Sequence, residues 1–472
     1  MRYLFSVSSD DVELLGELPL PEQAGCEIRL DTFDVPPNPV VLRSRTARPL
    51  LATFRSEAHL GRASREARDD QGWALRRSCL EAGFDWIDLE LDEPDLEAKI
   101  EEVHRFGKRV VLSHHDLEGG ESVHSAIASG LETRADIVKV IGTGTQAEDF
   151  RIQREWYRKV KPERLVLFYM GEDFAASRVL SLVYGAPFTF LTPGREPAVA
   201  PGQLTVTQVR DIFRVEEIEL ARLRLFAVIG KPIGHSRSPA FHNPLLKKYV
   251  SSALFLALPA VSEADLRCYF VTFPELEGLA VTKPMKAVAH EVAGTYEESD
   301  AWELGAANTL LAYGDHLTAD NTDFGAMKRL IETHVPKGET VRVLGYGGLG
   351  KAVVQACLSL GYPVQVTNRS KARLSDLPSA ATVVDWENRA CPGAYAWVQA
   401  TSVGMAPDDR ACPVEAIPAD LRLVVETIYN PRETQLMALA RTNGVQVLDG
   451  MALFEGQAAL QNQLFLRRLI HG

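Results

Sequence analysis

The strongest constraint on the fold is one pattern that the first part of the chain repeats eight times. A short apolar run rich in strand-forming residues is followed each time by a charged, Ala- and Leu-rich stretch typical of a helix. Eight strand–helix repeats over about 200 residues fit a (β/α)8 TIM barrel. A doubly wound open sheet is the structural alternative. The runs are YLFSVS (3–8), CEIRLDTF (26–33), LLATFRS (50–56), FDWIDLEL (84–91), RVVLSHHD (109–116), ADIVKVIG (135–142), RLVLFYMG (164–171) and PFTFLTP (187–193).

The run ADIVKVIG carries a charged residue, Lys139, in the middle of an apolar strand. Burying an ammonium group is costly, and a buried lysine tends to lose its proton. One interpretation is an edge strand whose lysine side chain reaches solvent. The other is a neutral amine that attacks a carbonyl carbon.

Further polar residues fall at or near the C-terminal ends of the predicted strands, where TIM-barrel enzymes place their catalytic groups. A lysine, a histidine that titrates near neutral pH and several arginines at one end of a barrel suit imine chemistry on an anionic ketone. Each residue alone is also compatible with a structural role, such as that of a hydrogen-bonded core histidine. The residues are Ser6, Glu27, Arg29, Arg55, Asp88, Glu90 and His115, with Arg178 after the seventh strand.

Residues 1–218 resemble the type I 3-dehydroquinate dehydratases, because CEIRLD, TFRS, IDLEL, SHHD, ADIVKV, the SR of AASRV and APGQ occur in the family's order. The resemblance implies that Lys139 forms a Schiff base with 3-dehydroquinate. It implies that His115 takes the α-proton and assists the loss of water, giving 3-dehydroshikimate, and that Arg178 clamps the substrate carboxylate. The other residues implied to bind substrate are Ser6, Glu27, Arg29, Arg55, Met170, Phe190 and Gln203.

Two positions depart from this family. Four residues beyond Arg55 the family usually has a glutamate that assists its histidine, and here the residue is His59. The serine that usually precedes APGQ is replaced by Val199. Neither departure removes the imine-forming pair.

The second half begins after the charged helical run RVEEIELARLR, and we place the domain boundary near residue 220. The loop GKPIGHSRSP carries Ser236 and Ser238, two apart on a segment expected to be extended, so that both side chains point to one side. GLAVTKPMK, LGAANTL and ADNTDFG then supply Lys286, Asn308 and Asp323. A cation, an amide and a carboxylate suit proton transfer and hydrogen bonding on a small polyol.

The segment TVRVLGYGGLGKAVVQACLSLG indicates a strand, a glycine turn and a helix, which is the context of a dinucleotide-binding site. A second strand, PVQVTNRS, ends about 20 residues later, where an NAD-selective fold would place Asp or Glu. The cations at that place suit a ribose 2′-phosphate and favour NADP over NAD; a basic surface turn is the alternative. The residues of the two segments are Gly345, Gly347, Gly348 and Gly350, then Asn368, Arg369, Ser370 and Arg373.

These motifs, with ATSVGM, IYNPRETQL and DGMALFEGQA, resemble shikimate dehydrogenase over residues 222–472. The resemblance implies a shikimate-binding lobe at 222–325, completed by 451–472, and an NADP-binding Rossmann domain at 326–450. It implies Lys286 and Asp323 as the acid/base pair. Shikimate would be held by Ser236, Ser238, Thr282, Asn308, Tyr429 and Gln457, and the NADP pocket would add Thr401, Met405 and Gly450 to the residues above. The departures are Tyr346, where the turn often has Ala, and Lys283, where VTxP usually has an apolar residue.

The overall composition argues against two classes of partner. With 51 basic and 63 acidic residues the formal net charge is −12, so no nucleic acid or anionic membrane surface is expected as a partner. No apolar run approaches about 18 residues, and the start MRYLFSVSSDD lacks a signal-peptide core. The six cysteines form no CxxC pair and no metal-ligand spacing, which predicts reduced thiols and no metal site. We expect a cytoplasmic protein, or an organellar one only if a transit peptide precedes it.

The product implied for the first half is the substrate implied for the second. The sequence therefore predicts a bifunctional shikimate-pathway enzyme that dehydrates 3-dehydroquinate and reduces 3-dehydroshikimate to shikimate with NADPH. One alternative is a quinate/shikimate dehydrogenase acting catabolically. Another is a non-catalytic metabolite sensor, which would be expected to have lost catalytic residues that this chain keeps.

Overall fold

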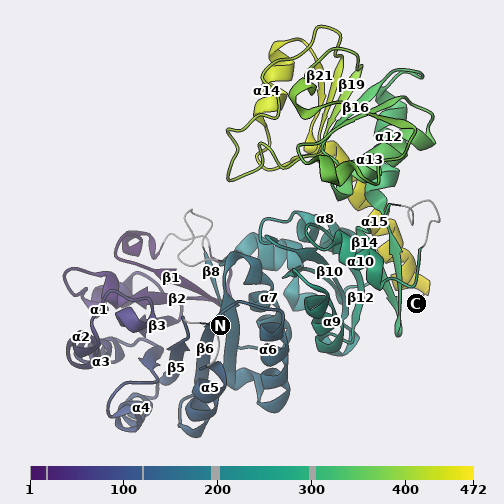
Figure 1. Cartoon of the computed structure of the whole chain (residues 1–472). Helices are drawn as coiled ribbons and strands as arrows, with labels where there is room; N and C mark the ends of the chain where they lie inside the picture. The colour runs from purple at the N-terminus through teal and green to yellow at the C-terminus, as the bar shows by residue number, and fades with distance from the viewer. Residues whose placement is uncertain are drawn as a thin grey trace. The chain divides into compact units, whose positions relative to one another are not determined.

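The computed structural model describes residues 2–16, 20–117, 119, 122–192, 202–296 and 304–471. The chain divides into two compact units, residues 1–276 and 277–472, and each is described by itself (Figure 1). The expected boundary near residue 220 falls inside the first unit, and the domain bounds drawn from the sequence remain a prediction. Val199 lies outside the described residues.

The first unit is built on a nine-stranded sheet with the order β7-β6-β5-β4-β3-β2-β1-β8-β9. All of its strand pairs are parallel, and the first eight strands follow one another in chain order, apart from β8, which lies beside β1. This is the arrangement of a TIM-type sheet. All eight predicted strands are present; the short β9 was not anticipated. The strands are β1 (Tyr3–Val7), β2 (Ala24–Arg29), β3 (Leu50–Thr53), β4 (Trp86–Glu90), β5 (Arg109–His115), β6 (Ile137–Thr143), β7 (Leu165–Met170), β8 (Thr189–Thr192) and β9 (Leu204–Thr205).

The helices that follow these strands cover the sheet, and the strands between them are buried along nearly their whole length. Strands covered in this way carry near-continuous apolar runs rather than alternating ones. This is why the runs were recognisable in the sequence. The longer helices are α3 (Trp73–Glu81), α4 (Leu96–Arg105), α5 (Val123–Glu132), α6 (Glu148–Lys159) and α7 (Ala175–Val183).

The strand register determines which polar side chains share a face. Glu90 pairs with Ser113, and Ser113 pairs with Lys139. Because side chains alternate along a strand, these three point to one side of the sheet, as does His115, two residues beyond Ser113. The register thus gathers the polar ends of β4, β5 and β6.

The first unit continues with a parallel pair, β10 (Arg224–Gly230) and β11 (Ala253–Pro259). Helix α8 (Ser238–Leu246) is fastened to β11 by Asn243, whose amide donates to the Phe255 carbonyl at 2.8 Å and accepts the Phe255 N–H at 2.9 Å. Helix α9 (Glu263–Thr272) begins with a capping box between Ser262 and Asp265.

The second unit contains an antiparallel ladder and a parallel sheet. In the ladder, β14 pairs with β12 and β15, and β13 lies parallel to β15. The parallel sheet has the order β18-β17-β16-β19-β20-β21, which is the strand order of a Rossmann fold. The strands are β12 (Leu276–Val281), β13 (Thr295–Tyr296), β14 (Thr309–Tyr313), β15 (His316–Asp320), β16 (Val341–Leu344), β17 (Val364–Thr367), β18 (Ala381–Val383), β19 (Ala396–Gln399), β20 (Leu423–Glu426) and β21 (Gln446–Leu448).

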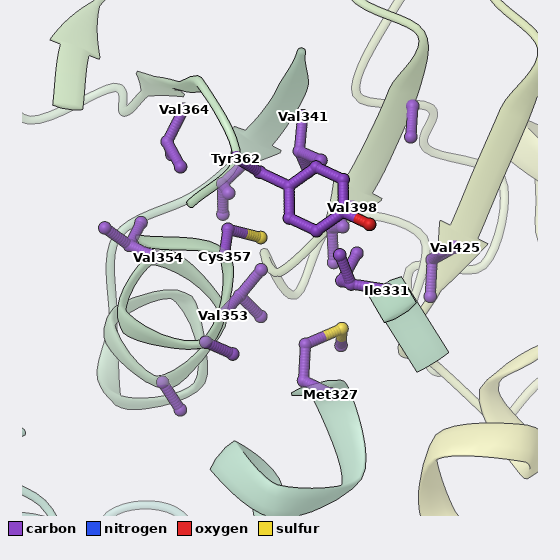
Figure 2. Packing of buried hydrophobic residues seen from close by; sticks show 14 of the residues in the cluster. Met327, Ile331, Val341, Val353, Val354, Cys357, Tyr362, Val364, Val398 and Val425 are labelled. Carbon is purple, nitrogen blue, oxygen red and sulfur yellow. The ribbon is translucent and has the colours of Figure 1, made fainter. Parts of the chain in front are cut away.

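Helices α12 and α13 pack on the Rossmann sheet through a buried apolar cluster (Figure 2). Met327 and Ile331 of α12 face Val353 of α13 and Val341 of β16 in this cluster. Because both β16 and α13 are held in this close-packed cluster, the turn between them has a fixed position relative to the sheet. The helices among the described residues of the second unit are α10 (Lys286–Val292), α12 (Thr322–His334), α13 (Gly348–Ser359), α14 (Gln435–Thr442) and α15 (Gly450–His471).

The last helix, α15, lies against the antiparallel ladder. The Gln461 amide donates to the Asn308 carbonyl at 2.7 Å, and Arg468 Nε donates to the Ala312 carbonyl at 2.7 Å. Among the described residues, no helix is both long enough and apolar enough to cross a membrane.

Candidate active sites

Lys139 is the third residue of β6 and only 3% of its surface is exposed. Its Nζ lies 3.3 Å from Asp88 Oδ2 and 4.7 Å from the centre of the Phe190 ring. Burial lowers the pKa of this ammonium, and the attraction of Asp88 only partly offsets it. Strand β6 lies between β5 and β7, so the interpretation as an edge-strand lysine is wrong. The amine is buried in the sheet interior.

Asp88 links this lysine to Arg55. Arg55 donates from Nη2 to Asp88 Oδ2 at 3.0 Å and from Nη1 to Ser113 Oγ at 2.6 Å. Burial opposes ionisation of Asp88, but the two cations outweigh it and the pKa of Asp88 is lowered. The sequence placed Asp88 at a strand end without assigning it to the site. Asp88 lies two residues before Glu90 on β4, so the sequence already indicated that the two side chains share one face of the sheet.

His115 ends β5 on the same face as Lys139. Its Nδ1 is buried and has no hydrogen-bond partner among the described residues. Burial first, and the cations of Arg55 and Lys139 next, lower the pKa of this imidazole well below its ordinary value. A neutral imidazole with a free nitrogen lone pair can accept a proton.

Arg178, in the first turns of α7, is a buried cation whose Nε has no hydrogen-bond partner among the described residues. Its guanidinium lies 4.1 Å over the Phe168 ring, and burial lowers its pKa to about 9. No carboxylate of the described chain pairs with it. A buried cation without a carboxylate partner favours the binding of an external anion.

A second cluster of polar groups lies in the second unit, where Lys286 opens α10 and Asp323 lies in the first turn of α12. Lys286 Nζ donates to Asp323 Oδ2 at 2.5 Å. The side chains keep exposed fractions of 20% and 10%, so the pair is accessible from outside. Such a pair can deliver a proton to a neighbouring oxygen.

Amide and hydroxyl groups surround this pair. The Asn308 amide donates to Thr322 Oγ1 at 2.9 Å and reaches Gln457 Oε1 at 3.5 Å, and the Ala307 N–H donates to the Lys286 carbonyl at 2.9 Å. Thr322 was not named from the sequence, although it directly precedes Asp323. The structure thus brings Lys286, Asp323, Asn308 and Gln457 together.

The glycine turn after β16 leads into α13, and each glycine has a separate role. Gly345 has a positive φ of 104°, and a Cβ on Gly350 would lie 2.2 Å from the Gly345 carbonyl oxygen. Gly347 has open space where a Cβ would be, and a Cβ on Gly348 would lie 3.6 Å from Lys286 Cδ. The turn is therefore open to a ligand at the N-terminus of α13 and adjoins the Lys286–Asp323 pair.

Two stretches of the chain match models of known families. Residues 23–219 match the type I 3-dehydroquinase model, and residues 228–310 match the substrate binding domain of shikimate dehydrogenase. The chain contains a type I 3-dehydroquinase domain and a shikimate dehydrogenase domain. It thus joins a dehydroquinate dehydratase and a shikimate dehydrogenase in one polypeptide.

Three solved structures show how the chain compares with single proteins. The dehydroquinate dehydratase and shikimate dehydrogenase of S. pombe is 21% identical, with 98% of this chain and 95% of that chain covered and a TM-score of 0.40. The shikimate 5-dehydrogenase of Thermus thermophilus, in complex with NADP(H) and shikimate, is 29% identical over 52% of this chain and 93% of that chain, with a TM-score of 0.47. The quinate dehydrogenase of Corynebacterium glutamicum, in complex with NAD, is 27% identical over 52% and 93%, with a TM-score of 0.45.

In the dehydroquinase domain, the polar shell residues named from the sequence are already paired with each other or with neighbours. Ser6 Oγ donates to Glu27 Oε2 at 2.5 Å, and Thr53 donates to Glu27 Oε1 at 2.9 Å. Arg29 forms two hydrogen bonds of 2.9 Å to Asp31. The Arg29–Asp31 pair was not foreseen, although the two residues are two apart in the sequence.

The apolar lining and Gln203 approach the end of β7. Met170 and Phe190 are 9% and 8% exposed. Gly202 packs so closely on the Gly171 carbonyl oxygen that a Cβ would lie 2.3 Å from it. Gln203 Oε1 is buried and has no partner among the described residues, so an acceptor is left available beside β7.

His59, which stands where the dehydroquinase family usually has glutamate, is buried beside His115. Its Nδ1 accepts the backbone N–H of His115 at 3.1 Å, and the two rings meet edge to face with centroids 5.8 Å apart. Because Nδ1 is an acceptor, the ring proton of His59 lies on Nε2, which is 3.8 Å from Asp92 Oδ1. His59 therefore holds the backbone of His115.

Ligand atoms of His59, Glu90 and Asp92 lie within 4.8 Å of one another, a spacing that could hold a metal ion. Arg68 Nη1 already donates to Glu90 at 2.6 Å and to Asp92 at 2.5 Å. The guanidinium already pairs with both carboxylates, and we assign no metal to this group.

In the dehydrogenase domain, the segment with Ser236 and Ser238 is not extended, contrary to expectation. Ser238 is the first residue of α8, and its N–H donates to Ser236 Oγ at 3.3 Å. The Pro that follows Ser238 starts the helix, since proline is favoured in a first helical turn. Thr282 follows β12 and is half-buried, whereas Lys283 is exposed.

The residues named for the nucleotide lie around the glycine turn and the end of β17. Asn368 Oδ1 accepts the Tyr346 N–H at 3.0 Å, and its amide donates to the Ser370 carbonyl at 2.8 Å. Arg369 and Arg373 are exposed, and within the described chain neither side chain has an ion-pair partner. Of the other residues predicted for the NADP pocket, Thr401 donates from Oγ1 to Gln399 Oε1 at 3.0 Å, and Met405 is 38% exposed. Gly450 packs on the Ile428 carbonyl. Tyr429, predicted to bind shikimate, has its ring centroid 5.3 Å from that of Phe454.

Proposed function

We propose that the dehydratase reaction passes through an imine on Lys139. The observation that carries this proposal is a buried lysine with a lowered pKa that shares one sheet face with the half-buried His115, whose pKa is also lowered. Lys139 Nζ adds to the ketone carbon of 3-dehydroquinate, and loss of water gives a protonated imine. His115 takes the α-proton, the C–H electrons move into the imine, and the β-hydroxyl leaves as water with a proton from His115. Hydrolysis of the imine returns the amine and releases 3-dehydroshikimate.

Two charged groups support these steps. The Asp88 carboxylate, 3.3 Å from Nζ, stabilises the cationic imine once it forms. Arg178 supplies a cation for the substrate carboxylate, because it has no carboxylate partner within the described chain. Ser6, Glu27, Arg55 and Gln203 form the polar shell around the ring hydroxyls, with Met170 and Phe190 as apolar lining. Arg29 is paired with Asp31, which also accepts the Arg55 N–H at 3.2 Å.

For the dehydrogenase reaction we propose that Lys286 protonates the oxygen of 3-dehydroshikimate as its carbonyl is reduced, and that Asp323 holds the Lys286 ammonium in place. Asn308, Gln457, Thr282 and Tyr429 would bind the hydroxyls of shikimate. The assignment of Ser236 and Ser238 to the same substrate remains a prediction.

The residues around the glycine turn fit NADP. The turn is open at Gly347, the N-terminus of α13 faces the same space, and Arg369 and Arg373 are unpaired within the described chain. Bound NADPH supplies the hydride. Gly345, Gly347, Gly348 and Gly350 would cradle its pyrophosphate, Asn368, Arg369, Ser370 and Arg373 its ribose phosphate, and Thr401, Met405 and Gly450 would lie toward the nicotinamide.

Borohydride trapping tests the imine. Incubation with 3-dehydroquinate and borohydride should leave a covalent adduct on Lys139, located by peptide mass spectrometry. Lys139→Ala should lose both the adduct and dehydration while keeping shikimate oxidation. A Lys139→Ala enzyme that dehydrates at the normal rate would refute the imine.

A coupled assay tests the sequence of two reactions. Supplying 3-dehydroquinate and NADPH to the purified chain should oxidise the nucleotide. Oxidation with 3-dehydroshikimate but none with 3-dehydroquinate would show an inactive dehydratase. Testing quinate and shikimate with both nucleotides addresses the catabolic alternative, which the comparisons do not favour. The cytoplasmic location and the lack of nucleic-acid partners remain predictions.

A further inference from the structure

The loop that follows β7 in the dehydroquinase domain is hydrogen-bonded to the loop that follows β10. The second of these loops leads to Ser236 and Ser238, the two serines predicted to bind shikimate. The first loop is Gly171–Phe174, between β7 and α7, and the second is residues 231–237, between β10 and α8, which Ser238 begins. Asp173 Oδ1 accepts the N–H of Ile233 at 2.6 Å and the N–H of Gly234 at 2.8 Å. One carboxylate oxygen therefore fastens two successive amides.

The two loops also pack closely. A Cβ on Gly234 would lie 2.6 Å from the Glu172 carbonyl oxygen, so only glycine fits at this contact. Ile233 is 2% exposed. The Asp173 carboxylate forms no ion pair with any described side chain, so its charge is available to strengthen the two amide hydrogen bonds.

The anchored turn leads directly to the serines. The Ile233 carbonyl accepts the Ser236 N–H at 3.0 Å, and Ser236 Oγ accepts the Ser238 N–H at 3.3 Å. The positions of both hydroxyls thus follow from the conformation of residues 233–236, and that conformation depends on Asp173.

The same loop contributes to the dehydratase site. Gly202, next to Gln203, packs on the Gly171 carbonyl, and Phe174 leads into the helix of Arg178. Phe174 stacks on Phe150 of α6 with centroids 5.5 Å apart and an angle of 11° between the planes. The loop is therefore held firmly on the barrel side and can act as a rigid support.

We propose that Asp173, a residue of the dehydroquinase domain, is a positioning residue of the dehydrogenase reaction. Its carboxylate holds the turn at Ile233 and Gly234 so that Ser236 and Ser238 meet shikimate. This inference rests on the proposed assignment of the two serines to shikimate. It makes the dehydratase barrel a structural part of the dehydrogenase substrate site.

The test compares Asp173→Ala and Asp173→Asn in the full chain. Asp173→Ala should raise the KM for shikimate about tenfold and change kcat less than about twofold, because hydrogen bonds from two amides to one charged group are lost. Asp173→Asn keeps an acceptor oxygen and should stay within about threefold of the wild type. Dehydratase activity should change by less than about twofold in both variants.

Asp211→Ala is the matched control, since Asp211 is an exposed carboxylate of the barrel that pairs with Arg210 and with no other described residue, and surface pairs contribute little. Hydrogen exchange gives a readout independent of activity: the Ile233 and Gly234 amides should exchange at least about tenfold faster in Asp173→Ala than in the control. An unchanged KM for shikimate in Asp173→Ala would overturn the inference. So would an equal loss of both activities, which would indicate general disruption of the barrel.

Ser236→Ala and Ser238→Ala separate the two levels of the argument. If neither changes the KM for shikimate, the proposed serine site fails. If they raise it and Asp173→Ala does not, the serine site stands and only the role of Asp173 is lost.

Discussion

Replacing Arg178 by methionine should stabilise the ligand-free protein while removing its affinity for substrate. Arg178 is 2% exposed, and burial lowers its pKa from the ordinary value of an arginine to about 9. One pKa unit corresponds to about 1.4 kcal/mol, so holding this cation in the folded state destabilises it by about 5 kcal/mol at pH 7. The penalty is complete below pH 9. It declines as the pH rises from there toward the ordinary pKa of an arginine, because the folded state releases the proton first.

Methionine fills much of the same space without charge but loses the guanidinium contact with the Phe168 ring. We therefore expect a net gain of about 2 kcal/mol in the free energy of unfolding of the barrel, or a rise in melting temperature of about 5 °C. Calorimetry at pH 7 with and without 3-dehydroshikimate, which carries a carboxylate, measures both effects. The ligand should raise the melting temperature of the wild type and not of Arg178→Met. A ligand-free Arg178→Met protein that melts below the wild type would refute the reasoning, because it would show that the buried cation is compensated in the fold.

Three further predictions follow from the two sites. His59→Asn, which keeps an acceptor near the position of Nδ1, should retain dehydration activity within about threefold. His59→Gln and His59→Ala should lose about 10- to 100-fold in kcat, which is the effect of a misplaced base. Equal losses in all three variants would exclude the proposal that His59 positions the His115 backbone. The pKa of His115 is lowered, and a base works above its pKa, so kcat for dehydration, which reports the enzyme–substrate complex after the amine has reacted, should hold as the pH falls from 7 to about 5.5; a decline centred near 6.5 would contradict this. Arg369→Ala combined with Arg373→Ala should raise the KM for NADPH at least about tenfold and leave that for NADH within about twofold, and equal increases would contradict the assignment of these arginines to the 2′-phosphate.

Local sequence patterns predicted much of the fold. The eight apolar runs became β1–β8 because strands buried on both faces must be apolar along their length. The glycine turn was predictable as well, since Gly345 needs a positive φ and Gly350 packs on a carbonyl where no side chain fits. The short β9 and the helical start at Ser238 were missed, because both depend on neighbours that the local pattern does not contain.

The sequence by itself determined which residue types are available for chemistry. They are Lys139 within an apolar strand, His115 at the end of the preceding strand, and Lys286, Asn308 and Asp323 in successive motifs of the second half. Only the tertiary structure decided their states. Burial lowers the pKa of Lys139, and Asp88, 51 residues earlier in the chain, partly offsets this effect. Asp173 holds Ile233 across 60 residues. Burial and pairing are properties of the space around a group, and segments far apart in the chain create that space.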